Sequence, residues 1–260
     1  MRFTDPRLHH SAYPRATLQV FSVEITKLRR KRKWPIHVFG MVTVRDCVDR
    51  SRNVLFRRER DDCQVLTRDA PCLRLTGPSR AVVFLDPAFL EVDLRVKGDT
   101  EAEDERLSSL EARIWRFEPI RSTLFRRDYA SELSTLTVTL GHLLQSVEAT
   151  VAVKTGAASS IPGEEVVLLD SGDDGNGVLV ADDGGVMLSR RVASVELKGE
   201  FKVSVKAWKG NGDRDELAQQ DEVVFKPKEA GRSYGALHVA SCQMDVTVAW
   251  SLISLIYIED

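Results

Sequence analysis

Cysteine is scarce in this sequence, and its spacing follows neither a metal-binding nor a disulfide-rich pattern. The 260 residues include four cysteines, at positions 47, 63, 72 and 242. Secreted domains that depend on disulfides are much richer in cysteine, and no CxxC pair supports a zinc site. The chain also opens without the apolar stretch of a signal peptide. We therefore expect reduced, buried thiols in a cytoplasmic protein that has no metal and no cofactor.

Long apolar runs are missing as well. The most apolar segment, residues 246–258, is interrupted by serine and threonine. It is also shorter than the ~20 residues that a membrane-spanning helix needs. We interpret it as a buried final strand with an extension and expect no membrane association.

Neither sign of charge is in clear excess. The sequence has 37 Lys and Arg against 39 Asp and Glu, and its formal net charge is -2. A nucleic-acid-binding protein usually shows a clear excess of positive charge. The composition therefore excludes a general positive field and leaves only local clusters as sites for a polyanion.

Recognisable catalytic motifs are absent. The sequence contains no His-x-x-x-His pair, no Gly-x-Ser-x-Gly elbow and no phosphate-binding Gly-Lys-Ser/Thr loop. We assign no catalytic residue and favour a non-catalytic binding or interaction module. The alternative is an enzyme that assembles its site from residues distant in sequence and acts on RNA or carbohydrate.

Alternation of apolar and polar residues is the dominant pattern in the chain. Between residues 89 and 97, Leu90, Val92, Leu94 and Val96 fall on one face and charged residues fall on the other. This period of two predicts a half-buried β-strand. Further strands are predicted at residues 18–25, 36–44, 133–140, 147–153, 166–169, 192–197, 201–208, 223–225 and 244–250. The segment 101–115 opens with acidic residues and predicts an acidic loop, with at most one helical turn, that enters a strand.

The two halves of the chain resemble each other. In the first half, the segments LQV (18–20) and MVTV (41–44) precede a predicted strand at 90–96. In the second half, the similar segments LTV (136–138) and TVAV (150–153) precede a predicted strand at 201–207. Chance similarity between valine-rich strands is the alternative to an internal duplication. The sequence thus predicts an all-β fold of two similar antiparallel units, built as two β-sandwiches or one fused sandwich. We assign residues 1–15 to an N-terminal tail, 16–130 to the first β-rich unit and 131–260 to the second.

Six segments carry a resemblance to a known family. They are ATLQVFSV (16–23), WPIHVFG (34–40), LTGPSRAV (75–82), VSVKAW (203–208), AGRSYG (230–235) and VTVAWSL (246–252). In this order they resemble a family of grass proteins with a conserved C-terminal domain of unknown function. The same domain is similar to the region that follows the toxin domain in jasmonate-induced ribosome-inactivating proteins of cereals.

The resemblance implies a plant protein with a role in stress or defence, but it transfers no catalytic residue. Ribosome-inactivating enzymes use a helical Glu-Ala-Ala-Arg motif. The nearest match is Glu111-Ala112-Arg113, which is one residue short and lies in a predicted strand. Glycosidase activity is therefore not expected.

The most concentrated charge in the sequence is a basic run between two predicted strands. It consists of Arg29, Arg30, Lys31, Arg32 and Lys33. Such a run is typical of a polyanion-binding surface for RNA or an acidic protein, or of a nuclear localisation signal. A merely solvated loop is the plainer interpretation. Arg57, Arg58 and Arg60, and also Arg126 and Arg127, are further clusters that the fold would have to bring to the same surface.

Two other features have structural interpretations. The Asp- and Gly-rich stretch at residues 170–177 lacks the ligand spacing of an EF-hand and is typical of a hairpin connection. Calcium held between loops with Asp182 and Asp183 is the alternative. Trp34, Trp115, Trp208 and Trp250 are expected in the core or at its rim, and a stacking platform for bases or carbohydrate is the alternative. The oligomeric state is not predicted.

Overall fold

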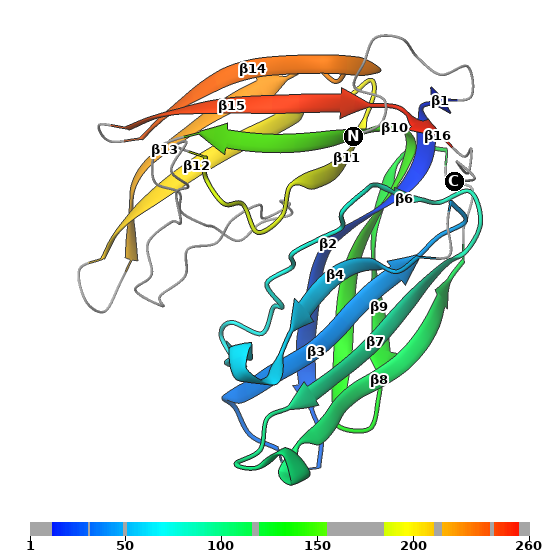
Figure 1. Ribbon diagram of the computed structural model, residues 1–260, viewed down its shortest axis with the longest axis vertical. Coiled ribbons are helices and arrows are strands. Elements are labelled where there is room, and N and C mark those ends of the chain that lie inside the picture. The colour runs from blue at the N-terminus through cyan, green and yellow to red at the C-terminus, as the bar shows by residue number, and fades with distance from the viewer. Residues whose placement is uncertain are drawn as a thin grey trace. The chain divides into compact units, whose positions relative to one another are not determined.

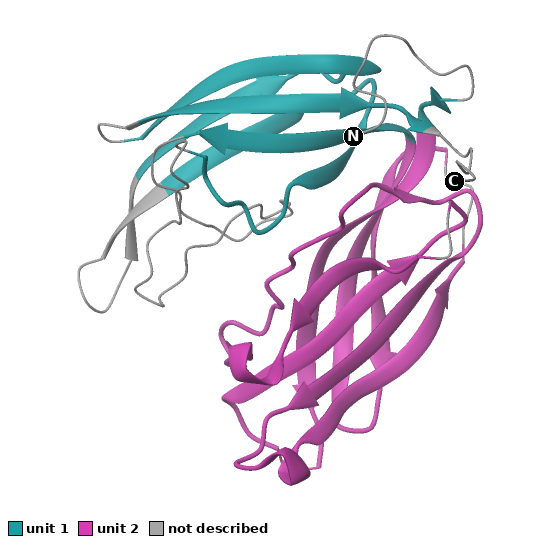
Figure 2. Ribbon diagram, in the orientation of Figure 1, with its two compact units in different colours: residues 1–14, 145–255 teal, residues 15–144, 256–260 magenta. Residues whose placement is uncertain are grey.

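The computed structural model describes residues 12–30, 32–48, 51–115, 120–154, 185–210, 215–239 and 242–254. Nearly every regular element among them is a strand, and the strands pair antiparallel, which confirms the predicted all-β class. The chain divides into two compact units (Figures 1 and 2). Unit 1 comprises residues 1–14 and 145–255, and unit 2 comprises residues 15–144 and 256–260.

Unit 2 contains two antiparallel sheets. One is built from β2 (Arg15–Leu28), β6 (Val82–Val83), β9 (Thr123–Ala130) and the first part of β10 (Ser134–Lys154). The other has the order β4 (Asn53–Arg58), β3 (Ile36–Arg45), β7 (Ala88–Val96) and β8 (Glu105–Ile114), and β5 (Gln64–Leu66) pairs with β3. Short 3-10 helices at Arg60–Asp62 and Glu101–Glu103 lie between strands. The second of these, followed directly by β8, confirms the helical turn that was predicted to enter a strand.

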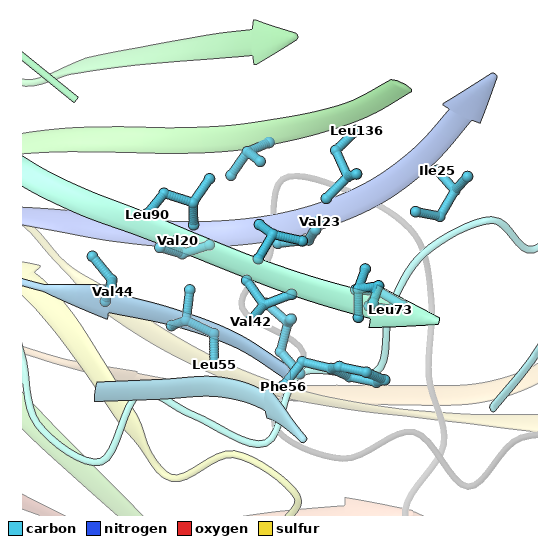
Figure 3. Close-up of a cluster of buried hydrophobic side chains, with 14 of the residues drawn as sticks. Val20, Val23, Ile25, Val42, Val44, Leu55, Phe56, Leu73, Leu90 and Leu136 are labelled. Atoms are coloured by element: carbon cyan, nitrogen blue, oxygen red, sulfur yellow. The ribbon is translucent and has the colours of Figure 1, made fainter. Parts of the chain in front are cut away.

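The core of unit 2 lies between its two sheets. In β7, Leu90, Val92, Leu94 and Val96 are all buried, as their alternation predicted. They join one cluster with side chains from β2, β3, β4 and β10, including Val20, Val42, Phe56 and Leu136 (Figure 3). The face of β7 that points away from this cluster carries Phe89, Glu91, Asp93 and Arg95.

Unit 1 is built around the second part of β10. Residues 146–150 of β10 pair with β11 (Val192–Glu196), and residues 148–154 pair with β15 (Cys242–Ser251). Next to β15 lies β14 (Ala230–Val239), while β12 (Phe201–Gly210) and β13 (Asp215–Phe225) form a hairpin. The short strands β1 (Ala12–Tyr13) and β16 (Ile253–Ser254) pair with each other. The core of unit 1 includes Trp250, whose ring lies edge-on to Phe201 at 5.9 Å between centroids.

The structure differs from the sequence predictions in the strands around β10 and in the boundary between the units. The separate strands predicted at 133–140 and 147–153 are wrong, because the ladder with β9 and then with β11 and β15 keeps β10 extended over 21 residues. The predicted strand at 166–169 lies outside the described residues. The proposed boundary at residues 130 and 131 differs from the division at 144 and 145, and the internal duplication stays a prediction.

Candidate polyanion-binding site

The basic run lies in the connection between β2 and β3 of unit 2, as the sequence predicted. The structure describes four of its five residues, and Lys31 lies outside the described part. The Arg29 amide donates to the Leu133 carbonyl at 2.8 Å, and the Arg32 amide donates to the Arg29 carbonyl at 3.2 Å. These two hydrogen bonds close a tight turn and attach it to the start of β10.

The backbone of this turn has an unusual feature at Arg30. Its φ is +53°, and it is the one residue other than glycine with a positive φ in the described ranges. For an L-residue with a Cβ atom the left-handed region costs roughly 1–2 kcal/mol, which is why glycine or asparagine usually occupies such positions. The chain therefore places an arginine where turn geometry alone would favour another residue.

The cations of the run differ in how strongly they are paired. Arg32 forms an ion pair with Glu105 of β8, and its side chain is 24% exposed. Arg30 lies 3.9 Å from Glu132, but both side chains are about 70% exposed, so this pair is worth little in water. The Arg29 guanidinium donates to the neutral Thr135 hydroxyl at 3.4 Å. Lys33 is exposed and has no ion pair within the part of the chain that the structure describes.

These side chains line a hollow of about 690 Å³, which we call the basic hollow. Its lining residues come from three segments: Arg29, Arg30, Arg32, Lys33, Glu105, Arg106, Glu132 and Leu133. Five of them are cations and two are carboxylates, so the basic hollow has a net charge of three positive units in a chain whose net charge is -2. Screening limits the reach of charges to ~8 Å at physiological salt, so a bound anion responds to this local excess rather than to the chain total.

Sequence reasoning missed Arg106, Glu105 and Glu132 as parts of this site. They are brought to the basic run by the register of β8 and by the loop between β9 and β10. Arg106 is exposed, and within the described residues it has no ion pair. The acidic composition around residues 101–105 hid it, and no local motif marks it.

The two other arginine clusters do not line the basic hollow. Arg57 pairs with Glu59 at 2.9 Å and Arg58 pairs with Asp62 at 2.7 Å. Arg60 donates to Asp104 at 2.9 and 3.2 Å, and this hydrogen-bonded guanidinium holds the pKa of the Asp104 carboxyl below its usual value. Most of the positive charge of the first cluster is thus balanced locally.

The calcium hypothesis cannot be compared with the described part of the chain. The calcium alternative at residues 170–177 with Asp182 and Asp183 lies outside the described residues. Elsewhere in the described ranges, no group of three or more His, Cys, Asp and Glu side chains has the arrangement of a metal site. The described helices include none that is long and apolar enough to cross a membrane.

The tryptophans divide into different environments. Trp250 is fully buried, and its Nε1 donates to the Ser233 hydroxyl at 2.9 Å. Trp34 packs at the edge of the unit 2 core. For Trp115 the core prediction is wrong: it follows the last residue of β8 and is 64% exposed, because the buried face of that strand ends at Ile114. The side chain of Trp208 lies outside the described part.

Comparison with solved structures returns human group IVD cytosolic phospholipase A2. For that protein the sequence identity is 10% and the TM-score 0.28, and the match covers 93% of this chain and 33% of the other. Its complex with methyl gamma-linolenyl fluorophosphonate gives 9% identity and a TM-score of 0.27, with 94% and 33% covered. The chain thus spans a third of those structures, and TM-scores this low support no inference about fold or activity.

Among curated proteins, none matches the sequence. A family match covers most of the chain, from residue 17 to residue 248. It includes the strands of unit 2, the basic hollow and most of unit 1. The chain belongs to the family defined by DUF6598, a domain of unknown function.

Proposed function

We propose that this protein is a non-catalytic binding module that holds the phosphates of RNA in its basic hollow. The observation that supports this proposal is the local excess of three positive charges in a nearly neutral chain. Each phosphate neutralised by Lys or Arg releases condensed counterions, and that release supplies much of the affinity of proteins for nucleic acid. An acidic protein surface is the alternative partner.

The backbone at Arg30 supports the same proposal. A residue held in a sparsely populated conformation is kept there by its surroundings, and such residues cluster at functional sites. Here the left-handed turn directs an exposed arginine toward the basic hollow. Glycine or asparagine would make the turn at lower cost but would remove one cation.

The wider biological role rests on the family resemblance. The similarity to grass proteins and to cereal jasmonate-induced proteins supports a plant protein that acts in stress or defence. We place it in the cytoplasm, with the nucleus as the alternative because of the basic run. An enzyme acting on RNA or carbohydrate is the alternative to a binding module.

The test is a binding titration with a fluorescein-labelled single-stranded RNA at several salt concentrations. Three weakly paired cations of the basic hollow are replaced together: Arg30→Ser, Lys33→Ser and Arg106→Ser. Among the described residues, Lys33 and Arg106 make no ion pair, and Arg30 makes only its exposed contact with Glu132. Arg29 and Arg32 are kept, because they contribute hydrogen bonds within the site. We expect the RNA affinity to fall about tenfold or more, and the slope of log K against log salt to become shallower by roughly 2.

A matched control removes the same charge elsewhere. Lys198, Lys226 and Lys228 are exposed cations of unit 1, and their replacement by Ser changes the net charge equally. If both triple variants lose affinity to the same extent, the basic hollow is not the site. If the RNA is recovered cleaved after incubation, the enzyme alternative replaces the binding module.

A further inference from the structure

A ladder of alternating guanidinium groups and aromatic rings lies on the outer face of unit 2. The register places Arg45 of β3 beside Phe89 of β7, and Phe89 beside Arg113 of β8. The guanidinium carbon of Arg45 is 5.6 Å from the centroid of the Phe89 ring, and that of Arg113 is 5.0 Å from it. Arg113 also lies 4.8 Å from the centroid of the Trp115 ring. We call these four residues the stacking ladder.

The sequence explains why the ladder faces outward. Val44, Leu90 and Ile114 are buried on the core side, so their neighbours Arg45, Phe89 and Arg113 point to the opposite face. Trp115 is the first residue after β8 and carries the row one step past the end of the sheet. Strands β3, β7 and β8 lie side by side in Figure 1.

Trp115 ends the ladder with an open ring. It is 64% exposed even though Arg113 lies over its ring. With one ring face occupied, exposure this large leaves the other face accessible to a ligand. A tryptophan buries 150–250 Å² when packed, so an exposed indole is a ready contact surface.

Arg113 has unused hydrogen-bonding capacity. Its guanidinium is exposed, and among the described residues it makes ring contacts but no hydrogen bond or ion pair. A guanidinium has five N–H donors in a planar fork that matches a phosphate. Because two rings already hold it in place, little side-chain freedom remains to be lost on binding.

The neighbouring charges are balanced, in contrast to Arg113. Arg45 lies 2.5 Å from Glu91 and 3.8 Å from Glu111, and Arg52 donates to Glu91 at 2.5 Å. Burial alone would raise the pKa of Glu91, but the hydrogen bond from Arg52 and the charge of Arg45 hold it below its usual value. Glu91 is therefore committed to two arginines, whereas Glu111 is largely exposed and pairs only weakly with Arg45. Arg113 has no ion pair among the described residues, so it is the cation of this group that a ligand can use.

We propose that Trp115 and Arg113 form a stacking site for one nucleotide of a single-stranded nucleic acid. The base lies on the open face of the Trp115 indole, and the Arg113 guanidinium donates to an adjacent phosphate. Single strands present unstacked bases for such contacts, whereas a duplex keeps its bases inside. A neutral sugar offers no anionic group to the Arg113 guanidinium, which makes no ion pair with any described residue, whereas a nucleotide offers its phosphate.

This site is separate from the basic hollow and does not depend on it. The basic run that lines the hollow precedes Ile36, where β3 begins, and the stacking ladder uses Arg45, where β3 ends. Ten residues of a strand span about 30 Å. The two sites can therefore succeed or fail independently.

The test compares two labelled probes: a single-stranded oligoadenylate of twelve nucleotides and an inorganic polyphosphate of similar charge. Trp115→Ala should weaken oligoadenylate binding about 5- to 100-fold, the range that the stacking of one base supplies. It should leave polyphosphate binding unchanged, because polyphosphate has no base. Trp115→Phe should restore most of the affinity. Arg113→Lys should bind oligoadenylate more weakly than wild type, because lysine keeps the charge but loses the planar fork.

Several outcomes would overturn this proposal. One is a Trp115→Ala variant that is folded, as its melting temperature shows, and binds oligoadenylate with the affinity of wild type. Another is a neutral xylan oligosaccharide that binds in a Trp115-dependent manner while oligoadenylate does not bind. The triple variant Arg30→Ser, Lys33→Ser and Arg106→Ser serves as the reference, because it should weaken the binding of both oligoadenylate and polyphosphate. If the triple variant binds both probes as wild type does while Trp115→Ala still weakens oligoadenylate binding, the proposed function is contradicted and the stacking site is supported.

Discussion

The guanidinium of Arg80 holds the carboxylate of Asp46 in a bidentate ion pair, with N–O distances of 2.6 and 2.9 Å. The Asp46 side chain is 1% exposed. Its carboxylate also accepts hydrogen bonds from the amides of Val83, at 2.7 Å, and Val48, at 3.1 Å. Asp46 follows β3 and Val83 belongs to β6, so this one carboxylate connects the two sheets of unit 2.

Asp46→Asn should destabilise the protein by about 3 kcal/mol. The asparagine keeps the size of the side chain but leaves Arg80 without its counter-charge, and breaking a buried pair typically costs 3–5 kcal/mol. We expect about the lower end because the Arg80 side chain is 27% exposed. Urea unfolding gives the measurement, and Arg57→Ser, which breaks an exposed pair with Glu59, is the control. Equal losses in both variants would contradict this assignment.

Stability should fall in acid through Asp104. Its folded pKa is lowered by the hydrogen bond from Arg60 and then by that from the Gly98 amide. A lowered folded pKa contributes stability that is fully present above the unfolded pKa, near 4, and is lost as pH falls through the folded pKa. Wild type should therefore melt at a higher temperature than Asp104→Asn at pH 7, and the two melting temperatures should converge as the pH is lowered to 2. A gap that stays constant with pH would refute the role of this carboxylate.

Two glycines with positive φ should respond differently to alanine. Gly40 has φ of +114°, and a Cβ there would lie 2.2 Å from the Asp93 carbonyl oxygen across the sheet. Gly231 has φ of +88°, and a Cβ there would meet nothing within 4 Å. We expect Gly231→Ala to cost about 1 kcal/mol from backbone strain alone, and Gly40→Ala at least about 3 kcal/mol because strands β3 and β7 must separate. Equal losses in chemical unfolding would show that contact across the sheet is unimportant.

The described thiols should react at different rates. Burial, and then the nearby Asp46 charge, raise the pKa of the Cys47 thiol, which lowers its thiolate fraction. The Cys63 sulfur lies 3.8 Å from Nδ1 of His37, which is exposed. We expect iodoacetamide to modify Cys63 before Cys47 near neutral pH, as peptide mass spectrometry would show. Faster labelling of Cys47 would contradict this ordering.

Most strands could be predicted from the sequence where one face is buried. The strand β7 was predicted because a half-buried strand requires apolar residues at every second position, here Leu90, Val92, Leu94 and Val96. The strands β4, β9 and β14 were not predicted. In β4 the adjacent Leu55 and Phe56 are both buried beside a β-bulge, which breaks the period of two. β9 has no buried residue and β14 has few, so they are held by ladder hydrogen bonds to β10 and β15 rather than by an apolar face. Backbone pairing of this kind leaves little trace in the side-chain pattern.

The candidate sites could be predicted only in part. The basic run was found because its five cations are adjacent, and its place between two strands followed from the apolar segments on either side. The stacking ladder had no such signal. Arg45, Phe89 and Arg113 are separated by more than twenty residues at each step and meet only through the register of three strands.

The sequence by itself determined that the protein is all-β, where many of its strands run and that a cluster of cations lies in a loop. Those properties depend on residues that are neighbours or alternate along the chain. The tertiary structure alone decided which cations are neutralised. Arg32 meets Glu105 from 73 residues away, while Arg113 meets two rings and no described carboxylate. An ion pair forms only when two charges lie within a few ångströms of each other. That distance depends on strand register and on how the sheets pack, and it cannot be read from the number of residues between the two charges.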